Sequence, residues 1–458
     1  MKWKPIFLLG LLFCTAPVAK AEKPPNILLI MADDLGWFDV RFNGNEHLDT
    51  PNLDRFVKQG MLFQHGYAAA PVCTPTRAAM LTGMSPARLA ITNHAPGFEP
   101  GMVPDGRTQA GAEKLTYLPL EAETIAERLK KEAGYATGFV GKWHLSHRKG
   151  LDEQGEKRAL GLRPKSQGYD INVGGNERGG PPTFFSPYKI PTLEDGPDGE
   201  YLPDRMATEC IRFIEAEKKG PFFLTFWNYS VHYPIEAPED LIAKYEKRPV
   251  ENAAYAAMIE GMDRSIGRVL KSLDDQGLTD NTMVIFTSDN GSLFGNGPLR
   301  ANKGHLYEGG IRVPWAIRWP GKVKPGSRND TPIITTDTFP TLLEVAGLLP
   351  KKGTPQDGES LLPLFAGGTL KRDSLFFHYP NYAFHKRNRL GGAIRKGSYK
   401  LIQFYDNDSV ELYDVITDRG EKKNLAESRP DLTAALRSEL GQWLKASGAK
   451  MPYLPAGK

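Results

Sequence analysis

The chain has 458 residues, of which 40% are hydrophobic and 24% are charged. This apolar share excludes a disordered chain and a coiled coil, and three cysteines in so long a chain exclude a disulfide scaffold. The net charge is +4, but Lys2, Lys4 and Lys20 lie within the first 21 residues, so the remainder carries only +1. We therefore expect no nucleic-acid partner, and the length indicates one large domain with a smaller one.

Residues 1–21 have the pattern of a secretory signal peptide. Two lysines precede an apolar run over residues 6–13, and an Ala-Lys-Ala site ends at Ala21. The run is much shorter than the roughly 20 apolar residues that cross a bilayer, and bulky Phe13 before Cys14 disfavours a lipoprotein signal. We expect cleavage after Ala21, a secreted or periplasmic protein, and no membrane attachment afterwards.

Apolar runs and amphipathic stretches alternate along the first two thirds of the chain. Short, almost continuous apolar runs are typical of strands buried on both faces, and they cover residues 26–31, 135–140, 222–227 and 282–287. Helical amphipathic patterns cover residues 124–133, 202–216 and 253–274. The alternation predicts an α/β fold with a large, mostly parallel sheet flanked by helices.

The pattern changes near residue 367. Residues 400–404 and 410–415 flank an Asp-Asn-Asp turn, which predicts a β-hairpin, and residues 430–444 form an amphipathic helical pattern. We therefore expect a catalytic domain over residues 22–366 and a small antiparallel α+β subdomain over residues 367–458.

Each of the four predicted strands is followed by polar residues. In open parallel sheets, ligands bind beyond the carboxyl ends of the strands. Such residues are usually ordinary loop residues, but their repetition after all four strands predicts one site along that edge. The residues are Asp33 and Asp34, Lys142 and His144, His232, and Asp289 and Asn290.

Four of these residues offer three carboxylates and one amide oxygen. An all-oxygen set favours a hard cation, Ca²⁺ or Mg²⁺, over Zn²⁺. The members are Asp33, Asp34, Asp289 and Asn290. The alternative interpretation is that the two adjacent aspartates cap a following helix.

The segment over residues 73–83 predicts a helix that begins at Cys73. Pro75 suits a first helical turn, and Gly83 is a plausible end. Cys73 would then lie where the helix dipole and free N–H groups stabilise an anion. Two alternatives remain open at this point: a small buried structural cysteine, or a disulfide with Cys210 in an oxidising compartment.

The Cys-Thr-Pro-Thr-Arg sequence at residues 73–77, followed by Leu-Thr-Gly, resembles the maturation signature of the formylglycine-dependent (type I) sulfatases. These form the arylsulfatase-like branch of the alkaline phosphatase superfamily. Four further motifs match the same family in the same order: Asp-Asp-Leu-Gly at residues 33–36, Gly-Lys-Trp-His-Leu at 141–145, Ser-Asp-Asn-Gly at 288–291, and Lys303-Gly304 with Tyr-Glu-Gly-Gly-Ile-Arg-Val-Pro at 307–314.

The resemblance implies that a maturation enzyme oxidises Cys73 to formylglycine. One hydroxyl of the hydrated aldehyde would attack sulfur and displace the alcohol, and the other would expel sulfate. Arg77 and Lys142 would polarise the diol, and His144 would take the proton during elimination. His232 and Lys303 would bind sulfate and assist the leaving group.

The resemblance also implies a metal ion, and it leaves two rival functions to consider. Ca²⁺, with Mg²⁺ as the alternative ion, would be held by Asp33, Asp34, Asp289 and Asn290 together with residue 73. A phosphodiesterase or phosphonate monoester hydrolase of the same superfamily is one rival. An inactive homologue that binds a sulfated glycan is another, although every catalytic residue type is present.

The least direct prediction concerns the substrate. We expect a terminal sulfated sugar, held in a pocket walled by residues 88–116 and 146–199. Arg88 and His378 are the candidate sugar contacts, because they lie in or beside the segments expected at the sheet edge. For His378 the alternative is that it only packs between the subdomains.

Overall fold

The computed structural model describes residues 1, 24–98, 101–146, 161–383 and 387–455. The predicted signal peptide, apart from Met1, lies outside these residues. Within them, no helix has both the length and the apolar character needed to span a bilayer.

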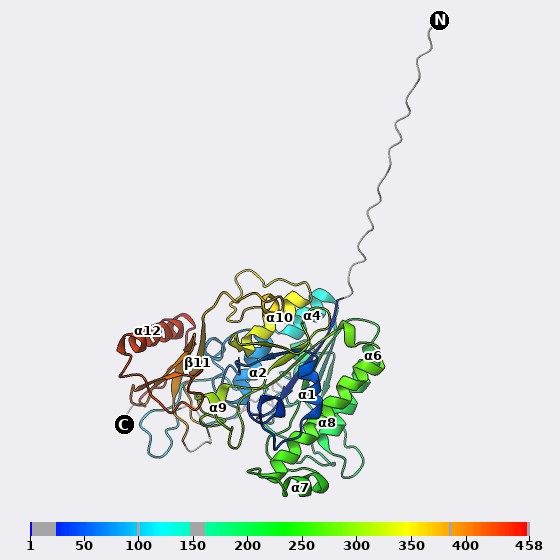
Figure 1. The fold of residues 1–458 in the computed structure, drawn as a ribbon, viewed down its shortest axis with the longest axis horizontal. Coiled ribbons are helices and arrows are strands. Elements are labelled where there is room, and N and C mark those ends of the chain that lie inside the picture. The colour runs from blue at the N-terminus through cyan, green and yellow to red at the C-terminus, as the bar shows by residue number, and fades with distance from the viewer. Residues whose placement is uncertain (2–23, 99–100, 147–160, 384–386, 456–458) are drawn as a thin grey trace.

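A large mixed sheet forms the centre of the protein (Figure 1), in the strand order β5-β4-β6-β1-β7-β8-β2-β9. The central strands β4, β6, β1 and β7 are parallel, whereas β8 runs antiparallel to both β7 and β2. The strands are β1 (Asn26–Ala32), β2 (Met61–Phe63), β4 (Ala136–Gly141), β5 (Ile171–Val173), β6 (Phe222–Trp227), β7 (Thr282–Ser288), β8 (Ala316–Arg318) and β9 (Ser327–Asn329). A separate two-stranded sheet pairs β3 (Gly66–Tyr67) with β10 (Ile333–Ile334).

Helices cover both faces of the large sheet because its central strands are apolar on both sides. Leu28 and Ile30 of β1 pack into the core beneath α1, α6, α7 and α8, whereas Ile27 and Leu29 pack beneath α2, α4 and α10. The first group is α1 (Pro51–Lys58), α6 (Leu202–Glu217), α7 (Glu239–Tyr245) and α8 (Ala253–Asp275). The second is α2 (Cys73–Thr82), α4 (Ile125–Ala133) and α10 (Thr338–Val345), together with the short helices α3 (Pro86–Leu89) and α11 (Leu362–Phe365), while α9 (Glu308–Ile311) packs in a separate cluster.

The four predicted strands and three predicted helices are confirmed, with ends that differ by at most one residue. The strands β2, β5, β8 and β9 were not predicted, because three residues are too few to show a periodic pattern. Cys73 and Cys210 are both buried and free, in helices on opposite faces of the sheet. A disulfide between them is therefore excluded.

The C-terminal part forms its own antiparallel sheet, in the order β11-β12-β13-β14. The helix α12 covers one face through an apolar cluster, and the other face packs on the large domain (Figure 1). The predicted hairpin and helix are confirmed. The elements are β11 (Ser374–Tyr379), β12 (Gly391–Lys396), β13 (Tyr399–Phe404), β14 (Val410–Asp414) and α12 (Pro430–Ala446).

A group of buried charges joins this C-terminal sheet to the large domain, and we call it the interface cluster. Lys400 Nζ, from β13, lies 2.9 Å from Glu308 Oε1 of α9 and 2.6 Å from Glu421. Glu421 Oε2 also accepts the backbone N–H of Glu308 at 2.7 Å. Arg312 and Arg395 complete the cluster, and all five side chains are buried. The stretch that contains α9 is thus fixed by residues from the C-terminal part.

Candidate active site

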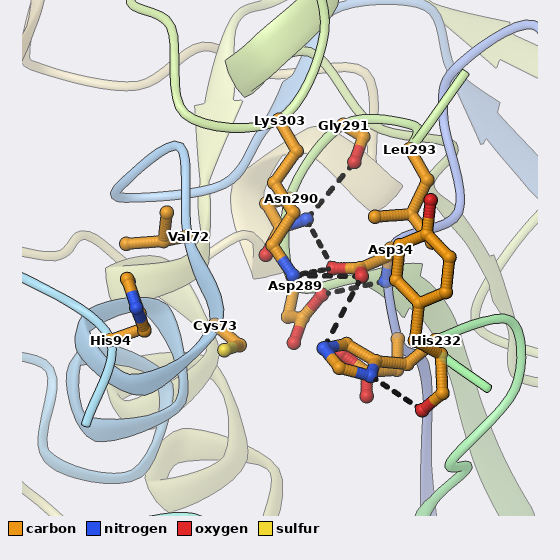
Figure 2. A network of polar contacts seen from close by, with 12 residues as sticks. Asp34, Val72, Cys73, His94, His232, Asp289, Asn290, Gly291, Leu293 and Lys303 are labelled. Carbon is orange, nitrogen blue, oxygen red and sulfur yellow. Dashed lines mark hydrogen bonds and ion pairs between the residues drawn. The ribbon is translucent and has the colours of Figure 1, made fainter. Parts of the chain in front are cut away.

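The residues predicted after the four strands meet at one edge of the large sheet. Strands β1, β4, β6 and β7 are parallel neighbours, so their carboxyl ends lie side by side. Hydrogen bonds and ion pairs join the side chains that follow these strands. Lys303, from the loop after β7, reaches the same place (Figure 2).

An acidic cluster formed by Asp33, Asp34 and Asp289 lies at the centre of this edge. The three side chains are fully buried, and one oxygen of each lies within 4.8 Å of the others. Asp33 Oδ1 and Asn290 Oδ1 accept no hydrogen bond from any described residue. Buried acceptors that lack donors are costly unless a ligand satisfies them. This oxygen-only donor set fits a hard divalent cation.

Each carboxylate of the acidic cluster has its own cationic partner. Lys142 Nζ donates to Asp33 at 2.6 Å, Lys303 Nζ donates to Asp34 at 2.7 Å, and Arg77 Nη2 donates to Asp289 at 2.7 Å. Three carboxylates therefore face three cations. A bound divalent ion would leave the site with excess positive charge, which suits an anionic ester.

Burial and these ion pairs shift the protonation of the cluster in different directions. Burial raises the pKa of Asp33, and Lys142 only partly opposes it. Burial alone would also raise the pKa of Asp34, but Lys303 and His232 hold it below its ordinary value. Burial alone would lower the pKa of Lys303, but Asp34 keeps it above its ordinary value, so Lys303 is cationic.

Cys73 begins α2, as predicted, and contacts His144. The Cys73 Sγ lies 3.3 Å from Nδ1 of His144, whose Nε2 lies 2.6 Å from the carbonyl oxygen of Ala95. A carbonyl oxygen only accepts, so Nε2 carries the proton and Nδ1 presents its lone pair to residue 73. Burial lowers the pKa of His144 well below its ordinary value, which keeps it neutral. His144 is thus oriented as a base toward residue 73.

His232 and Lys303 both contact Asp34 of the acidic cluster (Figure 2). His232 Nε2 is 3.7 Å from Asp34 Oδ2, and its Nδ1 donates to the carbonyl oxygen of Tyr233 at 2.9 Å. Burial, with help from Lys142 and Lys303, lowers the pKa of His232 to about 3. In this protonation state Lys303 is the better proton donor of the two.

Arg88 and His378 are not brought to this edge. Arg88 lies beyond the far end of the ten-residue helix α2, about 15 Å from its start, and its Nε and Nη2 donate to Asp357 at 2.9 and 2.7 Å. His378 is buried, and its two ring nitrogens contact Tyr405 Oη and the Lys450 carbonyl oxygen, both at 2.9 Å. Both ring nitrogens of His378 are therefore engaged within the protein, and Arg88 is held by Asp357, so neither side chain reaches the acidic cluster.

Residues that the sequence analysis missed lie beside Cys73. Figure 2 places His94 next to Val72 and Cys73, away from the acidic cluster. Its Nδ1 is 3.0 Å from Asn93 Oδ1, to which the hydroxyl of Tyr379 donates at 3.4 Å. Tyr379 follows His378 in β11, so it faces the opposite side of that strand. In the sequence, His94, Asn93 and Tyr379 could have been noticed through their position in or beside segments already expected at the site.

This fold and site together define a class: α/β hydrolases of the alkaline phosphatase-like superfamily, with a buried acidic cluster near a cysteine at a helix start. Residues 25–348 match the Sulfatase family model, and residues 301–447 match the model for the C-terminal part of N-sulphoglucosamine sulphohydrolase. The chain belongs to the sulfatase family and is a sulfuric ester hydrolase.

Relatives of known name are similar in sequence to this chain over most of their own length. A "Sulfatase" of Formosa agariphila is 31% identical over 98% of this chain and 94% of its own. Human arylsulfatase A is 33% identical over 93% of this chain and 89% of its own. Human N-acetylgalactosamine-6-sulfatase is 33% identical over 78% of this chain and 69% of its own.

Solved structures share the fold. The crystal structure of Ps i-CgsB in complex with k-i-k-neocarrahexaose has a TM-score of 0.78 and 27% identity, over 92% of this chain and 93% of its own. The phosphonate monoester hydrolase of Agrobacterium radiobacter has a TM-score of 0.65 and 20% identity, over 94% of this chain and 97% of its own. At that identity the second likeness concerns the fold alone.

Proposed function

We propose that this protein is an exported carbohydrate sulfatase that acts through a formylglycine made from Cys73. The observation that carries the proposal is the contact of Cys73, at the start of α2, with the oriented base His144 at 3.3 Å. Burial raises the pKa of the Cys73 thiol, so the unmodified thiol is a poor nucleophile. Oxidation by a maturation enzyme would give this position a reactive group.

The neighbouring side chains match the needs of such a residue. A hydrated formylglycine would supply one hydroxyl that attacks sulfur and a second whose deprotonation expels sulfate. His144 would take that proton, because its Nδ1 lone pair faces residue 73. Arg77 and Lys142, both buried beside the acidic cluster, would stabilise oxygen charge near residue 73.

Departure of the alcohol needs a proton and a counter-charge. Lys303 is cationic and lies at the acidic cluster, so it would donate to the ester oxygen that leaves. His232 would bind the sulfate group beside it and share this role once an anionic substrate favours its protonated form.

Asp33, Asp34, Asp289 and Asn290 would hold Ca²⁺, with Mg²⁺ as the alternative, and residue 73 would complete the set. The two buried oxygens without donors, Asp33 Oδ1 and Asn290 Oδ1, support this assignment. The ion would stabilise negative charge on sulfate oxygens.

The carbohydrate substrate and the location are supported by two further observations. Similar proteins bear the names N-acetylgalactosamine-6-sulfatase and, for a structure, a complex with neocarrahexaose. The signal-peptide pattern of residues 1–21 supports a secreted or periplasmic protein. We retain the prediction that the enzyme removes sulfate from a terminal sugar.

The test is release of sulfate by the mature protein from a panel of sulfated mono- and oligosaccharides, beside matched phosphate esters. We expect the highest kcat/KM on one of the small sulfated sugars. A preference for the phosphate esters would favour the phosphodiesterase or phosphonate hydrolase alternative. Binding of a sulfated glycan without release of sulfate would favour the inactive homologue, and activity confined to the interior of a polymer would exclude the terminal-sugar proposal.

A further inference from the structure

A second cavity lies at the opposite end of the large sheet from the acidic cluster. It has a volume of about 330 Å³ and lies between α1, α8 and the end of β8. In the sheet, Arg318 of β8 pairs with Val284 near the start of β7, whereas Asp289 follows the end of β7. The cavity is therefore separate from the catalytic residues.

The lining of this cavity is strongly cationic. Its charged residues are Arg55, Arg264, Arg268, Lys271 and Arg318, with Asp274 as the single carboxylate among them. The three from α8 also pair with acids outside the cavity: Glu260, Asp204 and Asp275. The pairs of Arg268 and Lys271 are exposed on both sides and are therefore weak, whereas Arg264 pairs with the buried Glu260. The side chains of Arg268 and Lys271 can therefore turn toward a ligand at little cost.

Arg318 is the feature that distinguishes this cavity from a solvated basic surface. It is only 2% exposed. Its Nη1 donates to Gln59 Oε1 at 2.9 Å, and its guanidinium lies 5.8 Å from the ring centre of Phe56. Its Nε and Nη2 have no hydrogen-bond partner among the described residues. A buried guanidinium with two unused donors is costly unless an acceptor reaches it.

We propose that this cavity is an anion site, additional to the active site, and that it binds a sulfate group through Arg318 and Arg55. A guanidinium presents a planar fork of donors that matches a tetrahedral oxoanion. Arg55 is exposed at the cavity and has no acidic partner within ion-pair distance in the described part of the chain. The volume admits a sulfate group together with part of a sugar that carries it. The bound group is either free sulfate or a sulfate ester on a glycan.

The first experiment locates the anion. Crystals of a Cys73→Ala variant, which cannot turn over substrate, are soaked in selenate, and the anomalous scattering of selenium is mapped. We expect one peak at the active site and a second within hydrogen-bond distance of Arg318. An active-site peak without a cavity peak overturns the proposal.

The second experiment tests the assigned arginines in solution. Calorimetric titration of Cys73→Ala with selenate should show two binding events. Adding Arg318→Gln or Arg55→Gln should weaken only the second event, by about tenfold or more, as expected for loss of a charged hydrogen bond. Arg437→Gln, an exposed arginine of α12, is the matched control and should change neither event. Because Arg55 is exposed, its variant keeps the test valid if Arg318→Gln fails to fold. Equal second-site affinity in the Arg55 and Arg437 variants would contradict the proposal.

The third experiment separates the two sources of the anion. A sulfated disaccharide and its unsulfated counterpart are offered to the selenate-soaked crystals. Displacement of the cavity selenate by the sulfated sugar alone assigns the site to a glycan sulfate. Retention of selenate against both sugars assigns it to free sulfate. Displacement by the unsulfated sugar overturns the proposal, because it shows that the cavity recognises the sugar rather than the anion.

Discussion

The protein buries two charge clusters, and they differ in what they leave unpaired. The acidic cluster at the sheet edge balances three carboxylates against three cations, yet Asp33 Oδ1 and Asn290 Oδ1 lack donors. In the interface cluster, both carboxylates accept hydrogen bonds, and Glu421 Oε1 lies 2.6 Å from Lys400 Nζ. Its remaining groups without a hydrogen-bond partner among the described residues are donors, Arg312 Nη1 and Arg395 Nε and Nη1, and both guanidinium groups lie against aromatic rings. Arg312 lies 4.7 Å from the ring centre of Trp37, and Arg395 lies 5.4 Å from that of Tyr67.

This difference indicates that the acidic cluster is a binding site, whereas the interface cluster stabilises the fold. Unpaired oxygens in a dry environment attract a cation, and the arrangement is stable only when one binds. The arginines of the interface cluster lie against ring faces and beside a buried carboxylate, with Arg312 Nη1 3.6 Å from Glu308 Oε2, so their charge is stabilised without a ligand. Arg318 differs, because it has no carboxylate within ion-pair distance in the described part of the chain and lines a cavity. Changes in the acidic cluster should therefore affect turnover, and changes in the interface cluster should affect stability.

The largest expected effect comes from Cys73→Ala. It should reduce kcat by at least about 1,000-fold, because it removes the proposed nucleophile, and leave the unfolding temperature almost unchanged. Peptide mass spectrometry of protein from a host with the maturation enzyme should find the aldehyde at residue 73. Cys210→Ala, a buried cysteine in α6, is the control and should keep kcat. Full activity in Cys73→Ala would end the formylglycine proposal.

Next comes Asp289→Asn, which removes one charge from the acidic cluster. It should lower kcat by more than the roughly 10- to 100-fold typical of outer-shell partners of a metal. It should also abolish the rise in unfolding temperature that Ca²⁺ produces in the parent protein by mass action. Asp357→Asn, which pairs with Arg88 far from the cluster, should keep that rise. Stoichiometric Zn²⁺ in active enzyme would contradict the hard-cation assignment.

In the interface cluster, Lys400→Met should destabilise the protein by about 3–5 kcal/mol, because it leaves Glu308 and Glu421 buried without their cation. Urea unfolding measures this loss, and the molecules that remain folded should keep most of their kcat. Lys396→Met, a partly exposed lysine of the neighbouring strand that pairs with Glu439, should destabilise the protein far less. Equal losses in the two variants would show that the interface cluster is not a distinct structural device.

The smallest expected effect is a dependence of stability on pH. Burial, partly opposed by Lys400, raises the pKa of Glu421 from 4.5 to about 7. Between these values the folded chain holds a proton that the unfolded chain has released, so stability falls as the pH rises through this window. The parent should lose up to about 3 kcal/mol more than Glu421→Gln between pH 4.5 and 7. Urea unfolding at both pH values tests this, and parallel pH profiles would contradict it.

The features that could be predicted from the sequence are those that depend on patterns in a continuous stretch of residues. The strands β1, β4, β6 and β7 have continuous apolar runs, and their polar ends converge because parallel neighbours share an edge. The placement of Arg88 depends on Asp357, which lies 269 residues away. No local sequence pattern indicates a pair so distant in the chain, so the partner of Arg88 could not be predicted.

The contrast between His378 and Tyr379 gives a second reason. Both lie in β11, and the sequence indicated that this region approaches the site. In a strand a shift of one residue exchanges the two faces, and the flanking residues do not show which face packs on the large domain. The hydroxyl of Tyr379 reaches Asn93, whereas His378 faces Tyr405.

The contacts of Lys400 and Glu421 with α9 also bear on the order in which parts of the chain fold. Ribosomes make the chain from its N-terminus, and domains generally fold in that order. Lys303 belongs to the stretch that Lys400 and Glu421 hold in place, and those residues are synthesised roughly a hundred positions later. The acidic cluster and Cys73 can therefore be in place while the lysine that donates to Asp34 still lacks its support. We therefore expect Lys303 to take its place at the acidic cluster only after residues 400–421 have been synthesised and have folded.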